Sequence, residues 1–590
     1  MARAGRSRLK LGGLPALSTV ALVCGSALLV LALLSIVGSR LLDVESLHYR
    51  LGGPPFNVAE FRSSSHVVPA QVRKKPVATH DELPELKDVP READPTIQNV
   101  WKPQYAEFYY GCSDPSDSYI SLSNIEQNGY IMIDASGGLN QQRTGITDSV
   151  VVARILNATL VVPVLDHKSF WHDPSNFSDI FDVEKFISTL VPDVPILKKL
   201  PRNIEKSSSP YPMRIPRKAT PIYYENRVLP KLLSRQVLRL TKFDYRLSNR
   251  LEQDLQKLRC RVNYKALHFT QPIIKMGQIL VERMRRLGGR YIALHLRYEP
   301  DMLAFSGCYY GGGDKERKEL GAIRRRWKTL HTKNPDKERR NGKCPLTPTE
   351  VGLMLRALGF GEDCHLYVAS GDVYGGEATL APLKALFPNY YTKETLATKD
   401  ELAPFQGYSS RMAAIDYTVC DESDAFVANN NGNMARILAG HRRYNGHKRT
   451  IRPNPKKLSP LFLTREALGW EQFALKVRHH QKGFMGDPNE VRPGRGEFHE
   501  NPAACICEKP NSPLHKPAFE KLTLKKQDKP ESKEDIDAED DLDSDSEDVG
   551  IDTEDDLVRT EFVGQEVLDA GTEEARLEDS EVEEIPTLSD

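Results

Sequence analysis

The sequence predicts an α/β protein built from two Rossmann-like lobes. Between about residues 100 and 455, short apolar or β-branched segments alternate with segments of helical spacing. The alternation occurs in two separate runs, and the 590 residues of the chain are too many for one compact core. Strands that alternate with helices form parallel sheets covered on both faces, so two such runs indicate two lobes.

The first run begins with a short apolar segment at Tyr130–Asp134, which predicts a strand. A glycine-rich loop follows at residues 135–140, and apolar residues at helical spacing predict a helix over 141–157. Residues 159–164 are β-branched and predict a second strand. We expect the loop to lie at the carboxyl edge of the sheet, where ligands of such folds bind.

The second run has the same rhythm. It predicts strands at residues 291–296, 365–369 and 424–428. It also predicts helices at residues 347–358, 377–387, 411–419 and 432–440. The helix at 347–358 opens with Thr-Pro-Thr-Glu, which is the pattern of a capping box with proline in the first turn.

The N-terminal part of the chain differs in composition from the lobes. Four basic residues precede an uncharged apolar run at 14–37, which is longer than the roughly 20 residues needed to cross a bilayer. The run also exceeds the apolar core of a signal peptide. We therefore expect a cytoplasmic tail at 1–13, an uncleaved transmembrane anchor at 14–37 and a lumenal body. Residues 38–100, rich in Pro, Lys and Glu, are expected to form a stem.

The net charge of zero hides two opposite excesses. Residues 531–590 hold 26 acidic and 3 basic residues, so this segment carries −23 and the remainder of the chain +23. We expect 531–590 to be a disordered acidic tail and 461–530 to be a basic, irregular extension. A basic body is typical of proteins that bind an anionic ligand, an acidic polymer or a membrane surface, although lysines that merely solvate the surface give the same excess.

Two other features agree with a lumenal body. Asn157 and Asn176 each begin an N-glycosylation triplet. Eight cysteines lie outside the apolar run, an even set that suits disulfide pairing in an oxidising compartment. Their connectivity is not readable from the sequence. No Cys-x-x-Cys pair or histidine cluster indicates a zinc site.

The strand predicted at 291–296 ends in two polar residues that share one face. His295 and Arg297 are two positions apart, and side chains with that spacing point the same way along a strand. Arginine offers a planar fork of donors suited to phosphate, and histidine can donate to a departing oxygen. Both donors suit a diphosphate leaving group. The alternative is structural: Arg297 paired with Glu299 or Asp301 and a satisfied histidine beside it.

Two further loops have the features of a ligand site. The loop Gly137–Arg143 combines glycines, which allow close backbone approach, with a helix start that attracts anions. The Asn- and Gly-rich turn within 422–434 brings backbone amides and short amide side chains to another helix start. Tight turns with left-handed residues explain either loop equally well when it is taken alone.

Five segments of these lobes together resemble the plant O-fucosyltransferase-like family, which is related to the peptide O-fucosyltransferases and includes pectin rhamnosyltransferases. The resemblance covers roughly residues 125–455. Its segments are Ser-Gly-Gly-Leu-Asn-Gln-Gln-Arg (136–143), His-Leu-Arg-Tyr-Glu-Pro-Asp-Met-Leu (295–303), Cys-Pro-Leu-Thr-Pro (344–348), Tyr-Val-Ala-Ser-Gly-Asp (367–372) and Gly-Asn-Met-Ala (432–435) with Gly-His-Arg-Arg-Tyr (440–444).

The resemblance implies a GT-B-type fold with a deep cleft, an acceptor-side lobe at 101–285 and a nucleotide-sugar-binding lobe at 286–460. It implies a type II anchor in the Golgi membrane. It assigns catalytic roles to Arg297, His295 and Asn140. It further implies contacts with the donor from Gly137, Gly138, Asn140, His295, Leu296, Arg297, Asp424, Asn431, Gly432 and Asn433.

One departure from the family concerns the general base. Some relatives place a glutamate in the glycine-rich loop, whereas this loop has none and Asp134 is the nearest acid. A base comes from elsewhere, or the transition state is dissociative enough to need little deprotonation. No metal or other cofactor is expected, because fixed cations would hold the diphosphate. The Asp-Ser-Asp at 543–545 lies in the acidic segment, where composition alone accounts for it.

The predicted function is that of a Golgi O-fucosyltransferase that moves fucose from GDP-fucose to a hydroxyl of a glycan or protein, with inversion. The alternatives are a rhamnosyl- or mannosyltransferase of cell-wall polysaccharide synthesis, with UDP-rhamnose or GDP-mannose as donor, and a non-catalytic glycan-binding protein. Expected partners are the nucleotide sugar, the glycan or glycoprotein acceptor and the Golgi membrane, and not nucleic acid.

Overall fold

The computed structural model of the chain describes residues 83–512, except 84–85, 96, 98, 123–124, 169–171, 326–329, 331–332 and 491–497. The predicted anchor at 14–37 and the predicted acidic tail at 531–590 lie outside these residues. Across the described ranges, we find no helix with the length and apolar character that a membrane span requires.

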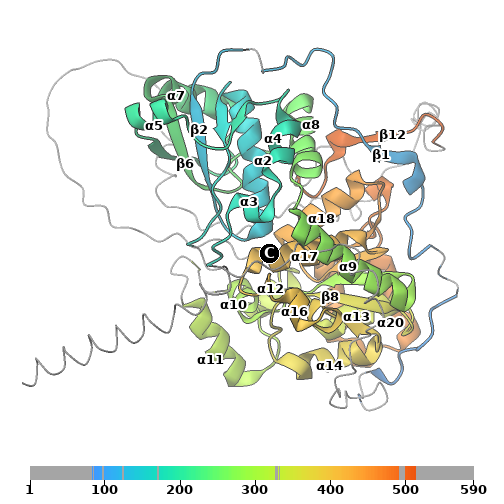
Figure 1. Ribbon diagram of the computed structural model, residues 1–590. Coiled ribbons are helices and arrows are strands. Elements are labelled where there is room, and N and C mark those ends of the chain that lie inside the picture. Colours follow the sequence, from blue (N-terminus) through green and yellow to red (C-terminus); the bar gives the residue numbers. More distant parts are fainter. Residues whose placement is uncertain are drawn as a thin grey trace, which may run out of the picture. The chain divides into compact units, whose positions relative to one another are not determined.

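The first sheet is parallel and has five strands in the order β4-β3-β2-β6-β5. Its neighbouring strands β2 and β6 are labelled in Figure 1. The strands are β2 (Tyr130–Ala135), β3 (Thr159–Val161), β4 (Ile196–Leu197), β5 (Tyr211–Arg214) and β6 (Val237–Phe243). Helix α2 (Leu139–Ile155) follows β2 and packs on β2 and β3. We call this part of the chain the N-lobe. The strand predicted at 159–164 is regular only to Val161, but Val164 still bridges Asp134.

The second sheet is also parallel and has five strands in the order β11-β10-β7-β8-β9. The strands are β7 (Tyr291–His295), β8 (His365–Ala369), β9 (Tyr390–Tyr391), β10 (Ala425–Ala428) and β11 (Arg449–Ile451). Its helices are α9 (Gln271–Gly288), α13 (Pro348–Ala357), α14 (Gly376–Leu386), α17 (Ser409–Glu422), α18 (Asn433–Tyr444), α19 (Pro455–Leu463) and α20 (Trp470–His480). We call this part the C-lobe. The mixed α/β fold with two parallel sheets is therefore confirmed.

Both sheets reverse their strand order beside the first strand of the lobe. In the C-lobe the chain runs from β7 outward through β8 and β9, then returns to place β10 on the other side of β7. In the N-lobe it runs outward from β2 through β3 and β4, and β6 returns to the other side of β2. In open α/β sheets, the carboxyl ends of strands at such a reversal form the ligand site.

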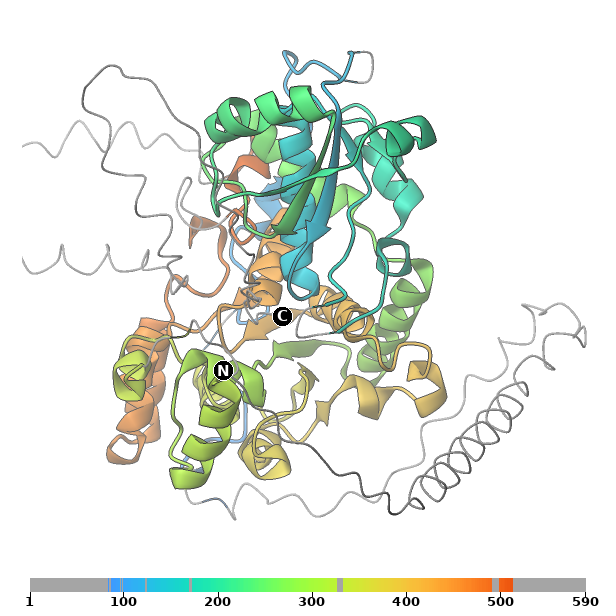
Figure 2. The same cartoon turned by 90° about the vertical axis from the view of Figure 1, so that its left-hand side faces the viewer.

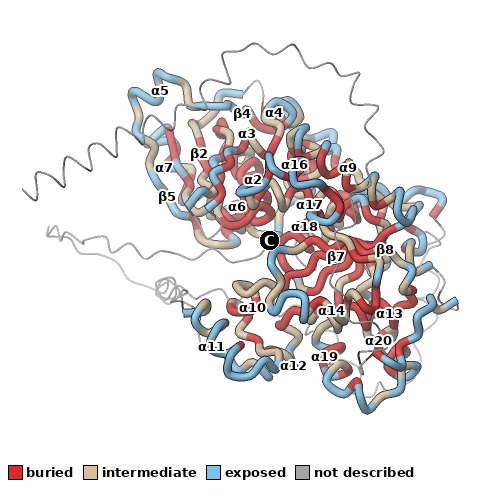
Figure 3. Tube along the Cα trace, turned by 60° about the horizontal axis from the view of Figure 1, so that its bottom comes forward, coloured by how far each residue is buried: buried red, intermediate tan, exposed pale blue. Residues whose placement is uncertain are grey.

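The side chains of β7 alternate between two hydrophobic cores, as its period of two requires. Tyr291 and Ala293 belong to the core that continues into the N-lobe, together with residues of α9 and α17. Ile292 and Leu294 belong to the second core, with residues of α13 and α14. All five residues of β7 are buried (Figure 3). The predicted capping box of α13 is present: Thr347 Oγ1 accepts from Glu350 N–H at 3.2 Å, and Glu350 Oε2 accepts from Thr347 N–H at 2.8 Å.

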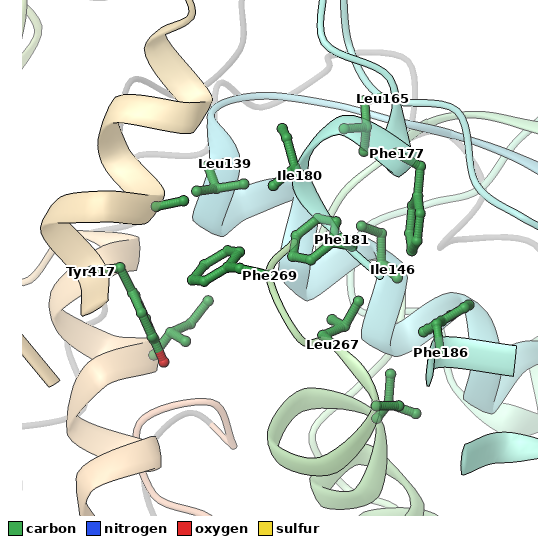
Figure 4. Close-up of a cluster of buried hydrophobic side chains, with 14 of the residues drawn as sticks. Leu139, Ile146, Leu165, Phe177, Ile180, Phe181, Phe186, Leu267, Phe269 and Tyr417 are labelled. Carbon is green, nitrogen blue, oxygen red and sulfur yellow. The ribbon is translucent and has the colours of Figure 1, made fainter. Parts of the chain in front are cut away.

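The core of the N-lobe is continuous with helices of the C-lobe. Phe269 and Tyr417, which lies on α17, pack edge to face with ring centroids 5.7 Å apart, beside Leu139 of α2 and Phe181 (Figure 4). Arg143 of α2 places its guanidinium 4.4 Å from the centroid of the Tyr417 ring. Such cation–π contacts contribute on the order of 1 kcal/mol. The arginine of the glycine-rich segment therefore joins α2 to α17.

Three disulfides account for six of the eight cysteines outside the apolar run: Cys112–Cys507, Cys260–Cys505 and Cys308–Cys344. Cys364 and Cys420 are free thiols. Two of the bridges hold a C-terminal segment against the N-lobe, where β12 (Ile506–Glu508) pairs antiparallel with β1 (Tyr109–Gly111). Figure 1 shows β12 beside β1, and Figure 2 shows the orange and red C-terminal segment reaching the N-lobe.

This architecture moves three of the predicted boundaries. Leu86 and Val89, placed in the stem, are buried in a C-lobe core. Helix α9 packs on α17 of the C-lobe, so that lobe begins near residue 271 rather than 286. The extension predicted as irregular at 461–530 contains α20 and β12 as far as residue 512. Each of these segments is short or is far in sequence from the residues it packs on. Composition therefore did not predict which lobe it belongs to.

A fully buried arginine on α18 holds the edge of the C-lobe together. Arg442 is 0% exposed and donates to four carbonyls within 3.0 Å: those of Cys420, Asp421, Ser423 and Arg449. These carbonyls belong to the end of α17, the turn before β10 and the start of β11. The planar guanidinium serves several acceptors at once, which a lysine ammonium cannot reproduce.

We predict that Arg442→Lys lowers the free energy of unfolding by about 3 kcal/mol, because several buried carbonyls lose their donors. Urea denaturation followed by tryptophan fluorescence measures this change. The matched control is Arg286→Lys on α9, because the Arg286 side chain is 69% exposed and pairs with Glu282. A loss below 1 kcal/mol for Arg442→Lys would contradict this account of the C-lobe edge.

Candidate active site

The candidate site lies where the strand order reverses in each sheet. In the N-lobe, the glycine-rich loop follows β2, and Tyr245 follows the neighbouring strand β6. In the C-lobe, His295 ends β7, and the Asn- and Gly-rich turn follows the neighbouring strand β10. The sequence segments that resembled a family therefore occupy the positions where this topology places a ligand.

A hydrogen bond joins these two sets of strand ends. The hydroxyl of Tyr245, beyond β6, donates to Oδ1 of Asn433 in the first turn of α18. Neighbouring strands are about 4.8 Å apart. The glycine-rich loop beyond β2 and the His295 end of β7 are therefore each one strand away from the Tyr245–Asn433 contact. The carboxyl edges of the two sheets meet at this point, which makes a single site from both lobes.

The backbone at Arg297 is fixed by the side chain of Asn429. Oδ1 of Asn429 accepts from Arg297 N–H at 2.8 Å, and its Nδ2 donates to the carbonyls of Arg297 at 3.1 Å and Leu346 at 3.0 Å. Asn429 is fully buried and its own backbone carbonyl accepts from Leu346 N–H at 3.0 Å. The carboxamide of Asn429 thus fixes the backbone in three places: after β7, after β10 and in the segment before α13.

The guanidinium of Arg297 is buried and carries a positive charge at this edge. It is 1% exposed, and its Nη1 lies 3.0 Å from Oε2 of Glu299. Glu299 is in turn held by Gly371 N–H, which donates to Oε1 at 3.0 Å. The pairing with Glu299 that the sequence offered as a structural explanation is therefore present. It orients Arg297 without excluding a role toward an anionic ligand.

His295 is a neutral imidazole beside this charge. Burial, followed by the charges of Arg297 and Lys393, lowers the pKa of His295 to about 3. Its ring is 3% exposed, and Nδ1 has no hydrogen-bond partner within the part of the chain that the structure describes. A buried polar nitrogen without a partner costs roughly 1–3 kcal/mol. This atom is consequently a candidate contact for a ligand at the end of β7.

Lys393 is a second cation near His295 that sequence reasoning missed. Its Nζ donates to Oδ2 of Asp416 at 2.8 Å and to the carbonyl of Ser370 at 3.1 Å, just beyond β8. Asp416 also accepts from the hydroxyl of Tyr367 at 2.6 Å. The lysine begins the short helix α15 (Lys393–Leu396), and no motif marked it. Lys393 lies in a segment where acidic and basic residues alternate, and this pattern does not distinguish a buried lysine from an exposed one.

The glycine-rich loop is held in a shape that only glycine adopts readily. Gly137 has a φ of +90°, and a Cβ there would approach Oε1 of Gln141 to 2.1 Å. Gly138 caps α2, and Asn140 lies fully buried in the first turn. The side chain of Gln142 accepts from Asp166 N–H at 2.9 Å and donates to the carbonyl of Gly137 at 2.8 Å.

The Asn- and Gly-rich turn contacts one ion-paired arginine. Asn431 is exposed, and Gly432 caps α18. Nη1 of Arg452 donates to Oδ1 of Asn431 at 3.4 Å. Burial, with the charges of Arg443 and Arg436, lowers the pKa of Arg452 to about 9. Arg452 also pairs with Oε1 of Glu500, and Arg443 lies in the last turn of α18, away from the helix N-terminus.

Two residues predicted to contact the donor do not direct their side chains to this edge. Asp424 precedes β10 and thus lies at its amino end, where Oδ2 accepts from Tyr291 N–H at 2.9 Å and pairs with Arg285. Leu296 is fully buried in the second core, and its N–H donates to the carbonyl of Ala369 at 2.9 Å. We correct both assignments: the first residue pins strand starts, and the second points away from His295 and Arg297.

Other predicted residues are placed as follows. Asp134, the nearest acid in sequence, binds Nε of Arg239 with both oxygens, at 2.8 and 3.1 Å. Asn176 is exposed at the start of the short helix α3 (Phe177–Ile180). Asn157 is partly buried with φ +45°, and its Nδ2 donates to the carbonyl of Glu126 at 2.8 Å. Of the two triplet asparagines, Asn176 is the accessible one in the folded chain.

The fold and the site define an α/β enzyme of two parallel sheets with cationic strand ends that suit an anionic ligand. A sequence model of the GDP-fucose protein O-fucosyltransferase family matches residues 130–445. Among curated proteins of Arabidopsis thaliana, O-fucosyltransferase 6 is 58% identical over 519 residues, covering 88% of each chain. O-fucosyltransferase 16 is 65% identical over 421 residues, covering 71% of this chain and 74% of the relative.

Among solved structures, POFUT1 in complex with GDP matches with a TM-score of 0.36 at 15% identity, over 56% of this chain and 99% of that chain. The sequence comparisons, together with the motifs at both strand-order reversals, settle the family. The chain belongs to the GDP-fucose protein O-fucosyltransferase family, and it is a glycosyltransferase.

We predict that Asn429→Asp lowers the free energy of unfolding by about 2–4 kcal/mol, because a carboxylate oxygen would then face the carbonyls of Arg297 and Leu346. Chemical denaturation measures this loss. The matched control is Asn430→Asp, since Oδ1 of Asn430 accepts from Gly432 N–H, which a carboxylate also does. Equal stability of the two variants would show that Asn429 does not organise the strand ends.

Proposed function

We propose that the protein transfers fucose from GDP-fucose to a hydroxyl of a glycan or protein, with inversion at the anomeric carbon. The observation that carries this proposal is the buried Arg297 at the strand-order reversal of the C-lobe, held by Asn429 and Glu299 beside the neutral His295. Family membership supports the donor, because the matching family is described by GDP-fucose.

In this mechanism the two lobes have separate tasks, as in a GT-B-type enzyme with a cleft between them. The C-lobe binds the nucleotide diphosphate with Arg297 and with the turn at Asn431–Asn433. The N-lobe presents the acceptor hydroxyl beside the glycine-rich loop and Asn140. The hydroxyl oxygen attacks the anomeric carbon while the bond from that carbon to the diphosphate oxygen breaks. The negative charge that grows on the diphosphate meets the guanidinium of Arg297, an interaction that strengthens in the transition state.

His295 contributes a neutral N–H rather than a positive charge. Its pKa of about 3 leaves the imidazole neutral near neutral pH. A neutral imidazole donates one hydrogen bond and accepts another. In the proposed complex it donates to an oxygen of the donor, and it does not act as the acid that protonates the leaving group. Arg297 therefore provides the main electrostatic stabilisation.

We propose that transfer proceeds without a metal ion, because the fixed guanidinium of Arg297 meets the charge of the diphosphate. We also place the lobes in the Golgi lumen behind an anchor at 14–37. The basic residues before that segment and the three disulfides of the body support this location. Rhamnosyl or mannosyl transfer is the alternative, since the described contacts suit the diphosphate of any of these donors.

We predict that Arg297→Ala lowers the rate of GDP release from GDP-fucose by at least about 100-fold, the usual effect of removing a donor that meets transition-state charge. The matched control is Arg285→Ala, which removes an ion-paired arginine from the amino edge of the same sheet. We expect the control to stay within about threefold of the wild type. Circular dichroism shows whether each variant is folded. Wild-type turnover by a folded Arg297→Ala variant would overturn the mechanism.

The donor itself is tested by calorimetric titration of the purified protein with GDP and with UDP, in the presence of EDTA. The proposal expects binding of GDP and little binding of UDP, without added metal. Binding of UDP alone would replace the fucosyl donor by a rhamnosyl donor. Binding of GDP only after addition of a divalent cation would contradict the metal-independent part of the proposal.

A further inference from the structure

The chain has an unusual backbone where β6 ends. Lys242 and Tyr245 have φ angles of +48° and +34°. Residues with a side chain disfavour this left-handed region, because Cβ then lies too close to a carbonyl oxygen. Such conformations persist only where the surrounding contacts hold them, and they gather at functional sites. We call residues 242–246 the β6 turn.

A buried ion cluster fixes the β6 turn. The carboxylate of Asp244, which is 2% exposed, accepts from Nη2 of Arg217 at 2.8 Å and lies 2.9 Å from Nη2 of Arg246. Arg246 also donates to the carbonyls of Ile215 at 2.8 Å and Lys242 at 3.0 Å. The last of these bonds closes the turn on itself. Removing one partner from a buried charge pair is strongly unfavourable, so the turn keeps this conformation.

The β6 turn is also fixed to the helix that follows the glycine-rich loop. Gln141, in the first turn of α2, donates from Nε2 to Oδ2 of Asp244 at 2.7 Å. Further along α2, Gly145 admits the backbone of Phe243, since a Cβ at Gly145 would lie 2.2 Å from the Phe243 carbonyl oxygen. The β6 turn therefore packs against the same part of α2 that carries Asn140.

Tyr245 extends from the β6 turn to the strand ends of the C-lobe. Its hydroxyl donates to Oδ1 of Asn433, the first residue of α18. The turn before α18 follows β10, whose last residue Ala428 is paired with His295 of β7. A carboxamide whose oxygen binds Tyr245 has its amide nitrogen turned away from Tyr245. Because Asn433 is 4% exposed, this bond fixes the orientation of a buried side chain.

We propose that Tyr245 is a positioning residue for the donor: it orients the carboxamide of Asn433 so that Asn433 contacts the diphosphate. The inference rests on the proposed function, in which the turn at Asn431–Asn433 binds the nucleotide diphosphate. Tyr245 acts only through Asn433. The bonds from Gln141 to Asp244 and from Tyr245 to Asn433 connect the acceptor-side loop with the donor-side turn. The affinity of the C-lobe for the nucleotide therefore depends on a hydroxyl of the N-lobe.

The test measures the affinity of the full chain and its variants for GDP by calorimetry, and for UDP if the wild type binds UDP instead. Tyr245→Phe keeps the ring and removes the hydroxyl. We expect its nucleotide Kd to rise about three- to tenfold, the usual effect of losing one hydrogen bond. Asn433→Ala should raise the Kd at least as much. When Asn433→Ala is already present, Tyr245→Phe should change the Kd by less than about twofold, because the carboxamide that Tyr245 orients is gone.

The matched control is Tyr119→Phe. Tyr119 is a partly buried N-lobe tyrosine whose hydroxyl donates to Oδ1 of Asp193 at 2.7 Å, before β4 and thus at the amino edge of the sheet. Its nucleotide Kd should equal that of the wild type, and circular dichroism shows whether each variant is folded. A wild-type Kd for folded Tyr245→Phe overturns the assignment, as does an equal rise with and without the Asn433 side chain. If the wild type binds neither nucleotide, the proposed function is overturned, and the positioning role with it.

Discussion

The buried carboxamide of Asn429 is the contact on which the rest of the site depends. The chain leaves the sheet after β7 and again after β10, and these exits must keep one spacing if they are to share a ligand. Asn429 bonds both the N–H and the carbonyl of Arg297, and also the carbonyl before α13. Because the residue is fully buried, water cannot replace these bonds. The position of Arg297 is therefore set by the strand next to its own.

The two lobes bring opposite chemistry to the same place. The C-lobe edge holds Arg297, Lys393 and Arg452, whereas the three central strands of the N-lobe each lead to an aspartate. The proposed displacement at a sugar carbon would use this division, since negative charge grows on the departing diphosphate while the attacking hydroxyl loses a proton. Similar strand-order reversals in both sheets align these edges. The strand order of the two sheets thus brings the charged strand ends of both lobes together.

The sequence allowed much of this to be predicted, and the failures have physical reasons. The apolar runs of β7, β8 and β10 were predicted within one residue, because parallel strands buried on both faces leave a clear signal. His295, Arg297 and the glycine-rich loop were placed at strand ends for the same reason. Asp424 was assigned from the family resemblance, although the strand predicted at 424–428 already put it at the amino end, away from the ligand edge. Asn429 was missed, since what distinguishes it is a partner more than 100 residues away.

The C-terminal segment that returns to the N-lobe has a consequence for how the molecule is made. Cys260 and Cys112 find their partners only at Cys505 and Cys507, near the end of the described chain. During synthesis, the first lobe to leave the ribosome must therefore wait, with two unpaired thiols, until nearly the whole body has been translated. Multidomain chains usually complete their N-terminal domain first. Here the order is reversed: the second lobe can close its Cys308–Cys344 bridge before the two bridges of the first lobe can form.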